Sequence, residues 1–150
     1  MDIVVRKNDL LRELQLFQGI VERKNTIPIL ANVLLDARDG EVKFLATDLE
    51  VGLRSRCEAT VTKPGVLTLP AKKLYEIVKS LPDTDVRIAE DKSGVKVAAD
   101  RFDSRMQTLP KDDFPTLPDG GTNPVAVLRG ASLKEMIAKT QFAITGEDTR

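Results

Sequence analysis

The chain has 150 residues, with 23 Lys plus Arg against 23 Asp plus Glu, no His and a single Cys. The zero net charge lacks the basic excess of many nucleic-acid-binding domains, and one Cys excludes a disulfide framework or a cysteine metal cluster. At 41% hydrophobic residues, this length suits one domain, or one domain with a piece of another.

The N-terminal stretch MDIVVRKNDLL has no apolar run long enough for a signal peptide. No later segment approaches the roughly 18 apolar residues of a membrane span. We therefore expect a soluble cytoplasmic protein whose lone thiol stays reduced.

Strand patterns dominate the chain. Apolar runs bounded by turn residues predict strands in DIVV, ILANVLLDA, EVKFLAT, VGLRSRCEATVT, GVLTL, DVRIA, GVKVAA and RFDSRMQTL. Asp39-Gly40 predicts a hairpin turn before EVKFLAT, and Ser93-Gly94 predicts another before GVKVAA. The predicted body is antiparallel and mostly β.

Three segments change to helical spacing. The first runs from about Asn8, with Asn8 or Asp9 as N-cap, and the second has Pro70 in its first turn. The third begins at Ser132, where SLKE matches a capping box. The apolar positions predicted to face a core are Leu10, Leu14, Phe17 and Val21, then Leu74, Ile77, Val78 and Leu81, then Leu133, Met136 and Ile137.

A step from strand to helix recurs at intervals of about sixty residues, a period that is typical of duplicated units. The first core residue of each helix, Leu10, Leu74 or Leu133, follows the end of a strand at the same distance. The spacing favours a duplicated unit of one strand, one helix and several strands. Chance recurrence of a common β-to-helix step is the alternative.

A proline-rich stretch, LPKDDFPTLPDGGTNP, cannot continue a sheet ladder and reads as a linker. We therefore expect a first domain at residues 1–120, made of two repeats at about 1–62 and 63–120. Residues 121–150 would then hold the linker and the incomplete start of a second domain, because one strand and one helix cannot enclose a core.

The sequence shows no catalytic arrangement. Without His, Ser-His and Cys-His pairs are excluded, and no P-loop or G-x-G-x-x-G occurs. The carboxylate pairs Asp48/Glu50 and Asp112/Asp113 lie at predicted turns, where such side chains commonly bond the backbone. Cys57 lies in a strand pattern, which favours a packing role. We expect no enzyme activity, cofactor or metal site.

Basic side chains expected outside the core, on the first two helices or in the loop between them, are Arg12, Arg23, Lys24, Lys72 and Lys79. One interpretation is a solvated face, with an ion pair between Lys72 and Glu76 at i,i+4. The other is a shallow set of phosphate contacts without base specificity. With 4% aromatic residues, a stacking platform for single strands is not favoured.

Four separated motifs resemble one known family. TIPILANVLL, FLATDLEVGL, LTLPAKKLYEIVKSLP and MQTLPKDDFPTLP are similar, in order and spacing, to the first domain of the beta subunit of bacterial DNA polymerase III, the sliding clamp. The resemblance covers essentially the whole chain. It implies an α+β DNA clamp fold, in which a duplicated β-α-β-β-β unit places helices on one face of antiparallel sheets.

The resemblance implies a ring. Two chains of three similar domains each would form a homodimer around double-stranded DNA, as a non-catalytic processivity factor of the polymerase. Enclosure keeps such a ring on DNA, so sequence-independent phosphate contacts suffice. The polymerase III core and the clamp loader would bind a groove between the second and third domains, beyond Arg150 and thus absent from this chain.

DNA-contacting positions also follow from the resemblance. Lys24, beside Arg23, matches a basic position in the loop after the first helix. Lys72 and Lys73 match a basic pair that opens the second helix, and Arg150 matches a basic position at the entrance to a loop of the second domain. The predicted DNA-binding set is Arg12, Arg23, Lys24, Lys72, Lys73, Lys79 and Arg150.

A dimer interface is implied along RFDSRMQTL, the edge strand that this family pairs with the third domain of the other chain. Ser104 and Met106 align with positions that can both be apolar, so Ser104 places half of a hydrophobic patch in doubt. Lys73, Arg101 and Arg105 keep the positive charge of the predicted interface.

The competing hypothesis is a protein-interaction scaffold that reuses the clamp fold without binding DNA. The location of charge on the folded helices separates the two hypotheses. A clamp needs Arg12, Lys24, Lys72 and Lys79 on one concave side.

Overall fold

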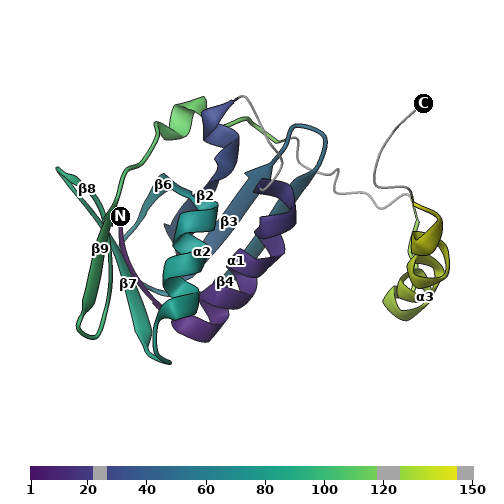
Figure 1. The fold of residues 1–150 in the computed structure, drawn as a ribbon, viewed down its shortest axis with the longest axis horizontal. Helices are drawn as coiled ribbons and strands as arrows, with labels where there is room; N and C mark the ends of the chain where they lie inside the picture. Colours follow the sequence, from purple (N-terminus) through teal and green to yellow (C-terminus); the bar gives the residue numbers. More distant parts are fainter. Residues whose placement is uncertain (22–26, 118–125, 145–150) are drawn as a thin grey trace. The chain divides into compact units, whose positions relative to one another are not determined.

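The computed structural model describes residues 1–21, 27–117 and 126–144. The chain divides into two compact units, Met1–Leu117 and Pro118–Arg150, and Figure 1 labels the principal elements. The elements of the first unit are β1 (Asp2–Arg6), α1 (Lys7–Val21), the 3-10 turn η1 (Pro28–Ala31), β2 (Asn32–Arg38), β3 (Glu41–Thr47), β4 (Gly52–Glu58), β5 (Thr60–Lys63), β6 (Gly65–Pro70), α2 (Ala71–Ser80), β7 (Asp85–Asp91), β8 (Gly94–Ala99), β9 (Phe102–Met106) and the 3-10 turn η2 (Lys111–Asp113).

The first unit contains two antiparallel sheets. One has the strand order β5-β1-β7-β8-β9 and the other has the order β4-β3-β2-β6. The two halves of the unit exchange their first strands, because β1 pairs with β7 and β6 pairs with β2. The order β1-α1-β2-β3-β4 is thus repeated as β6-α2-β7-β8-β9, with β5 as an added edge strand.

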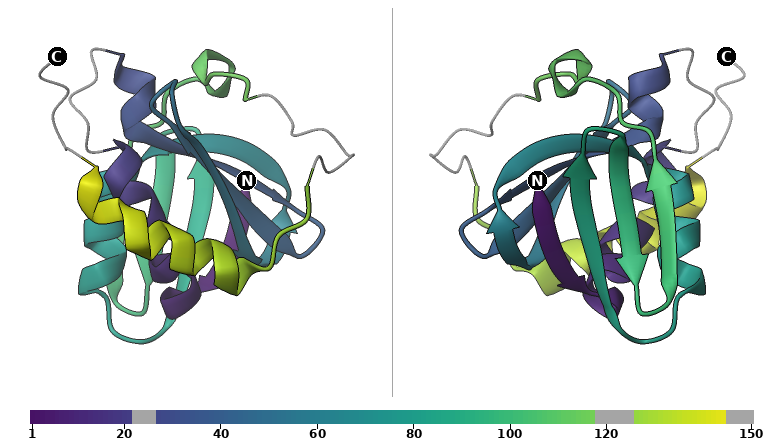
Figure 2. Two further views of the ribbon diagram at one scale, coloured as in Figure 1. Left: turned by 90° about the vertical axis from the view of Figure 1, so that its right-hand side faces the viewer. Right: turned by 90° about the vertical axis from the view of Figure 1, so that its left-hand side faces the viewer.

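The two helices pack against each other and lie on the same side of the sheets, as both views in Figure 2 show. α1 also packs against β1, β3 and β4, and α2 packs against β2 and β6. This arrangement confirms the predicted α+β fold, with a duplicated unit and its helices on one face of antiparallel sheets.

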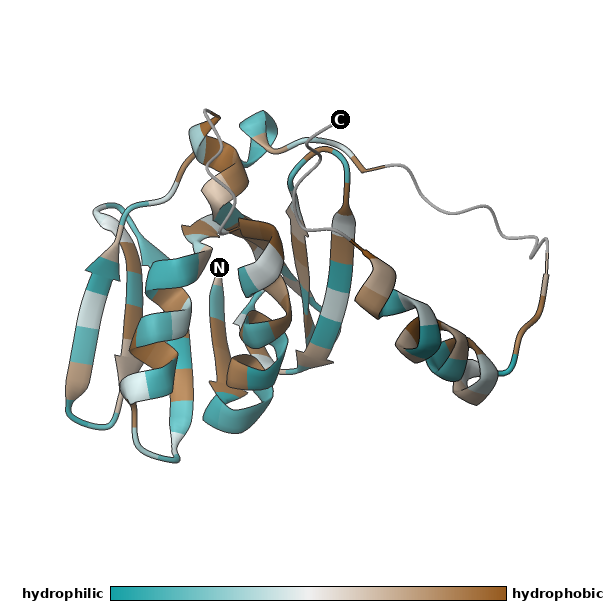
Figure 3. Ribbon diagram, turned by 45° about the vertical axis from the view of Figure 1, so that its right-hand side comes forward, coloured by the Kyte–Doolittle hydropathy of each residue, from teal (hydrophilic) through white to brown (hydrophobic). Residues whose placement is uncertain are grey.

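The core lies between the helices and the sheets, and the strand alternation explains which side chains fill it. Figure 3 shows hydrophobic and hydrophilic positions interleaved along both helices, as one-sided burial requires. The rings of Phe17 and Phe44 meet here with centroids 6.3 Å apart. Core residues from the helices and from β2 and β3 are Leu10, Leu14, Phe17, Ala71, Leu74, Val78, Val33, Leu35, Ala37, Val42, Phe44 and Ala46.

The helix starts differ from the predicted ones. α1 begins at Lys7, so Asn8 and Asp9 lie in its first turn and neither is the N-cap. The Lys7 N–H donates to the Thr84 carbonyl (3.0 Å), and the Asn8 amide donates to the Asp83 carboxylate (2.8 Å). These long-range partners replace the local cap that the sequence suggested.

The start of α2 also differs, because Pro70 closes β6 and stands at the N-cap, with α2 beginning at Ala71. The prediction placed Pro70 within the first helical turn. In the structure, Pro70 lies one position before that turn.

The strand predictions need two corrections. The stretch ILANVLLDA contains the turn η1 before β2 begins at Asn32. The stretch VGLRSRCEATVT splits at Ala59, whose N–H donates to the Gly40 carbonyl (2.9 Å). The two pieces join different sheets, because β4 pairs with β3 and β5 pairs with β1.

Of the two predicted turns, Asp39-Gly40 is confirmed. The φ angles of Asp39 and Gly40, 52° and 78°, are both positive, as a two-residue hairpin turn of type I′ requires. The second turn lies at Lys92-Ser93, and Gly94 (φ 127°) already opens β8. A Cβ at Gly94 would meet the Met106 carbonyl oxygen at 2.9 Å, so glycine is needed there for space as well as for its backbone angle.

In the unit Pro118–Arg150, the described residues form α3 (Gly130–Thr140) and the 3-10 turn η3 (Gln141–Ala143). α3 begins before Ser132, and its N-cap is Arg129, which makes no side-chain cap. The predicted capping box at Ser132 is therefore wrong. Leu133, Met136 and Ile137 follow at helical spacing but are exposed.

Candidate nucleic-acid interface

The solvent side of α2 carries three exposed lysines. Leu74 and Val78 are buried, while Lys72, Lys73 and Lys79 are exposed. The spacing of the lysines follows from helical geometry, since positions 72 and 79 are two turns apart on one face.

Lys72 and Lys73 make no ion pair within residues 1–21, 27–117 and 126–144. The predicted pair between Lys72 and Glu76 is therefore not formed. Lys79 lies over the ring of Tyr75, with its Nζ 5.6 Å from the ring centroid, a contact that leaves its charge uncompensated. Both ammonium groups at the start of α2 are available to an anion.

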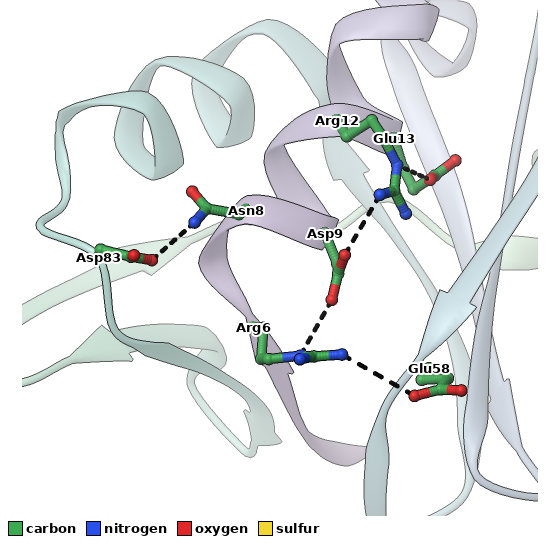
Figure 4. Close-up of polar contacts among 7 residues, drawn as sticks. All are labelled: Arg6, Asn8, Asp9, Arg12, Glu13, Glu58 and Asp83. Atoms are coloured by element: carbon green, nitrogen blue, oxygen red, sulfur yellow. Dashed lines mark hydrogen bonds and ion pairs between the residues drawn. The ribbon is translucent and has the colours of Figure 1, made fainter.

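Arg12 has a different environment from the lysines of α2, as Figure 4 shows. Its Nε lies 3.0 Å from Glu13 Oε1 and its Nη1 lies 3.4 Å from Asp9 Oδ1. Asp9 also accepts from Arg6 (3.1 Å), which reaches toward Glu58 at 4.0 Å. A phosphate contact by Arg12 would compete with two carboxylates, so the DNA-contacting role of Arg12 stays a prediction.

Three other predicted DNA-binding residues, Arg23, Lys24 and Arg150, lie outside the described residues. The concave arrangement that was expected to include Lys24 therefore stays a prediction as well.

In the carboxylate pair Asp48/Glu50 at the β3–β4 turn, Asp48 bonds the backbone. The Asp48 carboxylate accepts from the N–H groups of Glu50 (3.0 Å) and Val51 (2.7 Å). The Thr47 hydroxyl accepts from the N–H of Leu49 (3.0 Å), whose φ of 79° is left-handed. These bonds hold a strained turn closed and confirm the structural interpretation of this pair.

Cys57 lies in the core of the first unit, as the strand pattern predicted. Burial, followed by the nearby charges of Glu13 and Asp9, raises the pKa of the Cys57 thiol to about 12. A thiol that stays protonated is a poor nucleophile.

No group of three His, Cys, Asp or Glu side chains in the described part of the chain could hold a metal ion. Among the same residues, no helix has the length and apolar character needed to cross a membrane.

The family is decided by comparison with known proteins. Residues 1–118 match the model of the DNA polymerase III beta subunit, N-terminal domain. The chain belongs to this family. The beta sliding clamp of Pseudomonas putida is 38% identical over 154 aligned residues, which span 100% of this chain and 41% of that protein.

Solved structures agree with this family. The Caulobacter crescentus pol III beta structure matches 99% of the chain at a TM-score of 0.91 and 38% identity. A sliding clamp from Bartonella birtlesii, bound to griselimycin, matches 100% of it at a TM-score of 0.92 and 36% identity. The chain spans 40% and 41% of the length of these two proteins and corresponds to the N-terminal part of a beta subunit.

The implied dimer-interface strand of this beta subunit chain is β9, the outer strand of its sheet. Arg101, Arg105 and Lys73 are exposed, Ser104 is half-buried, and Arg105 lies 3.5 Å from Asp91. Met106 is only 1% exposed, so its side chain belongs to the core and is not presented at the strand surface. The interface itself stays a prediction.

Phe102 was not among the predicted interface residues of this strand. It lies on the same side of β9 as Ser104 and Met106, because side chains two positions apart share a face, and it is 39% exposed. The alternation of side chains along a strand could have shown that Phe102 shares this face. The exposed apolar side chain of the edge strand is Phe102, and the buried one is Met106.

Proposed function

We propose that the chain is the N-terminal part of a sliding clamp, the processivity factor of a replicative DNA polymerase. In this proposal the full-length protein is a cytoplasmic, non-catalytic subunit that encircles duplex DNA as a homodimeric ring. It tethers the polymerase III core and other replication or repair proteins, and it accepts the clamp loader, through a groove beyond Arg150. Membership of the beta subunit family supports the proposal.

The proposal assigns residues 1–120 to the first clamp domain and 121–150 to the linker and the start of the second. It assigns the helix layer to the DNA side of the ring, and β9, with Lys73, Arg101, Ser104 and Arg105, to the dimer interface, where Met106 supports the strand from the core. The exchange of β1 and β6 between the two sheets supports treating the two repeats as one domain.

One observation carries the DNA-binding part: Lys72 and Lys73 are exposed at the start of α2 with no carboxylate partner in the described residues. Flexible ammonium groups without fixed partners can meet phosphates in many positions, directly or through water. A protein that moves along DNA needs such contacts, since base-specific ones would hold it at one sequence.

The other predicted contacts have unequal support. Lys79 shares the face of Lys72, although its ammonium lies over Tyr75. Arg12 would first have to leave Asp9 and Glu13. Arg23, Lys24 and Arg150 complete the proposed set through the family resemblance alone.

A site-specific label tests this assignment, and buried Cys57 makes the labelling selective. In the variant Lys72→Cys, a thiol-reactive fluorophore should attach to the new cysteine, because the Cys57 thiol has a pKa of about 12. The matched control is Lys92→Cys, in the exposed turn between β7 and β8 of the five-stranded sheet.

At low ionic strength, duplex DNA should change the emission of the label at position 72 and leave the label at 92 unchanged. Random duplexes of different sequence should act alike. An equal response at both positions, or none at either, would support the scaffold hypothesis instead.

A further inference from the structure

The outer face of the four-stranded sheet, opposite α1 and α2, contains a hollow of about 390 Å³. Its lining side chains form two rows that run across β2, β3 and β4, because the strand register places their residues opposite one another. The rows are Leu34–Leu45–Arg54 and Asp36–Lys43–Arg56.

The floor of the hollow is apolar. Leu34 and Leu45 are half-buried and pack against a small cluster made by Ile29, Leu30 and Phe114. This cluster is separate from the main core and supports the floor of the hollow through Leu34 and Leu45. Two leucines side by side on the solvent face of a sheet are therefore covered from one direction only.

The charged ends of the side chains around the floor are held in ion pairs. Arg38 donates hydrogen bonds to both carboxylate oxygens of Asp36, at 2.8 and 2.7 Å. Lys43 and Arg56 both point to Glu41, each at 3.3 Å. With their charged heads held in these pairs, Lys43 and Arg56 line the hollow with their aliphatic stems.

Arg54 is held in a different direction. Its Nη2 donates to the carbonyl of Leu117 at 2.9 Å.

The charge around the hollow is not balanced. One carboxylate, Glu41, serves two cations, Lys43 and Arg56. On the outer face of the five-stranded sheet, three ion pairs each join one cation to one carboxylate: Asp2–Arg87 (2.6 Å), Lys96–Asp103 (3.0 Å) and Arg105–Asp91 (3.5 Å). A positive charge without a full partner next to an apolar floor is complementary to a ligand with an apolar group and a carboxylate.

We propose that this hollow binds an extended, acidic segment of a partner protein. A Leu-sized side chain of the segment would lie on Leu34 and Leu45, and a carboxylate two residues along would lie over Lys43 and Arg56. This site is on the face opposite the helices, so it is independent of the proposed DNA contacts.

The spacing of the two rows favours a peptide. Rows two residues apart along a strand are separated by about 6.6 Å. In an extended peptide, side chains i and i+2 lie on one face at the same separation. An apolar residue followed two positions later by Asp or Glu therefore matches both rows at once.

The size and openness of the hollow also favour a side chain. Its volume is near the lower end of the roughly 300–1,000 Å³ of small-molecule pockets, which enclose most of their ligand. This hollow opens to solvent on a sheet face and could cover one side of a free small molecule only. A peptide adds contacts along its backbone.

The test is an NMR titration of the ¹⁵N-labelled 150-residue chain with the synthetic peptide acetyl-Ser-Leu-Thr-Glu-Ser-amide. We expect shifts at the amides of β2, β3 and β4 around the hollow, and no comparable shifts in α2 or β8. Two control peptides replace either the Leu by Ser or the Glu by Lys, and both should bind more weakly.

Two charge variants sharpen the test. Lys43→Gln and Arg56→Gln are changes at exposed positions that should not disturb folding, and each should weaken peptide binding by about 1.5- to 5-fold. The matched control, Lys92→Gln, removes one positive charge from the turn between β7 and β8 of the five-stranded sheet and should leave the affinity for the peptide unchanged.

Three results would overturn the proposal. The first is the absence of shifts around the hollow at millimolar peptide. The second is equal affinity for the Glu and Lys peptides, because the charge argument would then be wrong. The third is displacement of the peptide by duplex DNA with shifts at the same amides, which would assign the hollow to a nucleic-acid surface.

Discussion

Leu74 lies on the buried face of α2, and none of its side chain is exposed. Its neighbours in the sequence are the exposed Lys73 and the partly buried Tyr75. Leu74→Ala should lower the free energy of unfolding by about 2–5 kcal/mol, because it removes buried methyl groups and leaves a cavity. Urea unfolding measures the change. Lys72→Ala is the control on the same helix and should stay within about 0.5 kcal/mol of the parent; equal losses would mean that α2 does not pack as described.

Asp2 provides a pH-dependent prediction. It accepts two hydrogen bonds from Arg87, at 2.9 and 2.6 Å, and this contact lowers the pKa of the Asp2 carboxyl. A lowered folded-state pKa means that the stabilisation is fully present above the unfolded-state pKa, about 3.9, and is lost as the pH falls through the lower folded-state value. Asp2→Asn should therefore show a shallower loss of stability than the parent below about pH 4. Urea unfolding across this range gives the answer, and parallel curves would contradict it.

Single residues also show the limit of prediction for the candidate site. The outward position of Lys72 and Lys79 follows from helical spacing, and it was correctly predicted. The partners of Arg12 were missed, although Asp9 lies three positions before it, a spacing that allows an ion pair on a helix, and Glu13 is the next residue. Spacing allowed the ion pair of Arg12 with Asp9 and also the pair of Lys72 with Glu76, and only the first of these forms.

At the scale of elements, the exchange of first strands makes each half of the first unit depend on the other. β1 completes the sheet of β7, β8 and β9, and β6 completes the sheet of β2, β3 and β4. A half made alone would lose a strand from its sheet and leave the freed strand without a partner.

We therefore expect that residues 1–63 and residues 64–117, produced separately, do not fold. Circular dichroism and NMR dispersion of each piece would measure this, and mixing the two should restore folded signals. Cooperative unfolding of either piece by itself would mean that the repeats are independent domains.

The sequence predicted those elements whose signals are local. The turn at Asp39-Gly40 follows from residue chemistry, and the helices follow from periodicity. The break at Ala59 was missed, because an unbroken strand pattern runs through a point where the chain changes sheets. The cap at Ser132 was wrong because a sequence match to a capping box does not fix where a helix begins.

For the whole molecule, the distribution of charge matters more than its sum. The net charge is zero, yet the lysines of α2 make no ion pairs in the described residues, while the outer face of the five-stranded sheet holds the ion pairs Asp2–Arg87, Lys96–Asp103 and Arg105–Asp91. Three acidic and three basic residues are thus paired on that face, whereas the three lysines of α2 are left without ion pairs in the part of the chain that the structure describes. The overall composition could not reveal this, and the family motifs pointed to it.

The most direct measurement of the central claim is the salt dependence of duplex DNA binding. Each phosphate contact contributes about 0.9 to the slope of log affinity against log salt, so two or three contacts by Lys72, Lys73 and Lys79 correspond to about 2 to 3 units of slope. The triple variant with these lysines changed to Ala should lose that part of the slope. A second triple variant, with the exposed Lys63, Lys92 and Lys111 changed to Ala, removes the same charge elsewhere on the first unit and should keep the parent slope. Equal slopes for the two triple variants would contradict the assignment of α2 to the DNA side of a clamp.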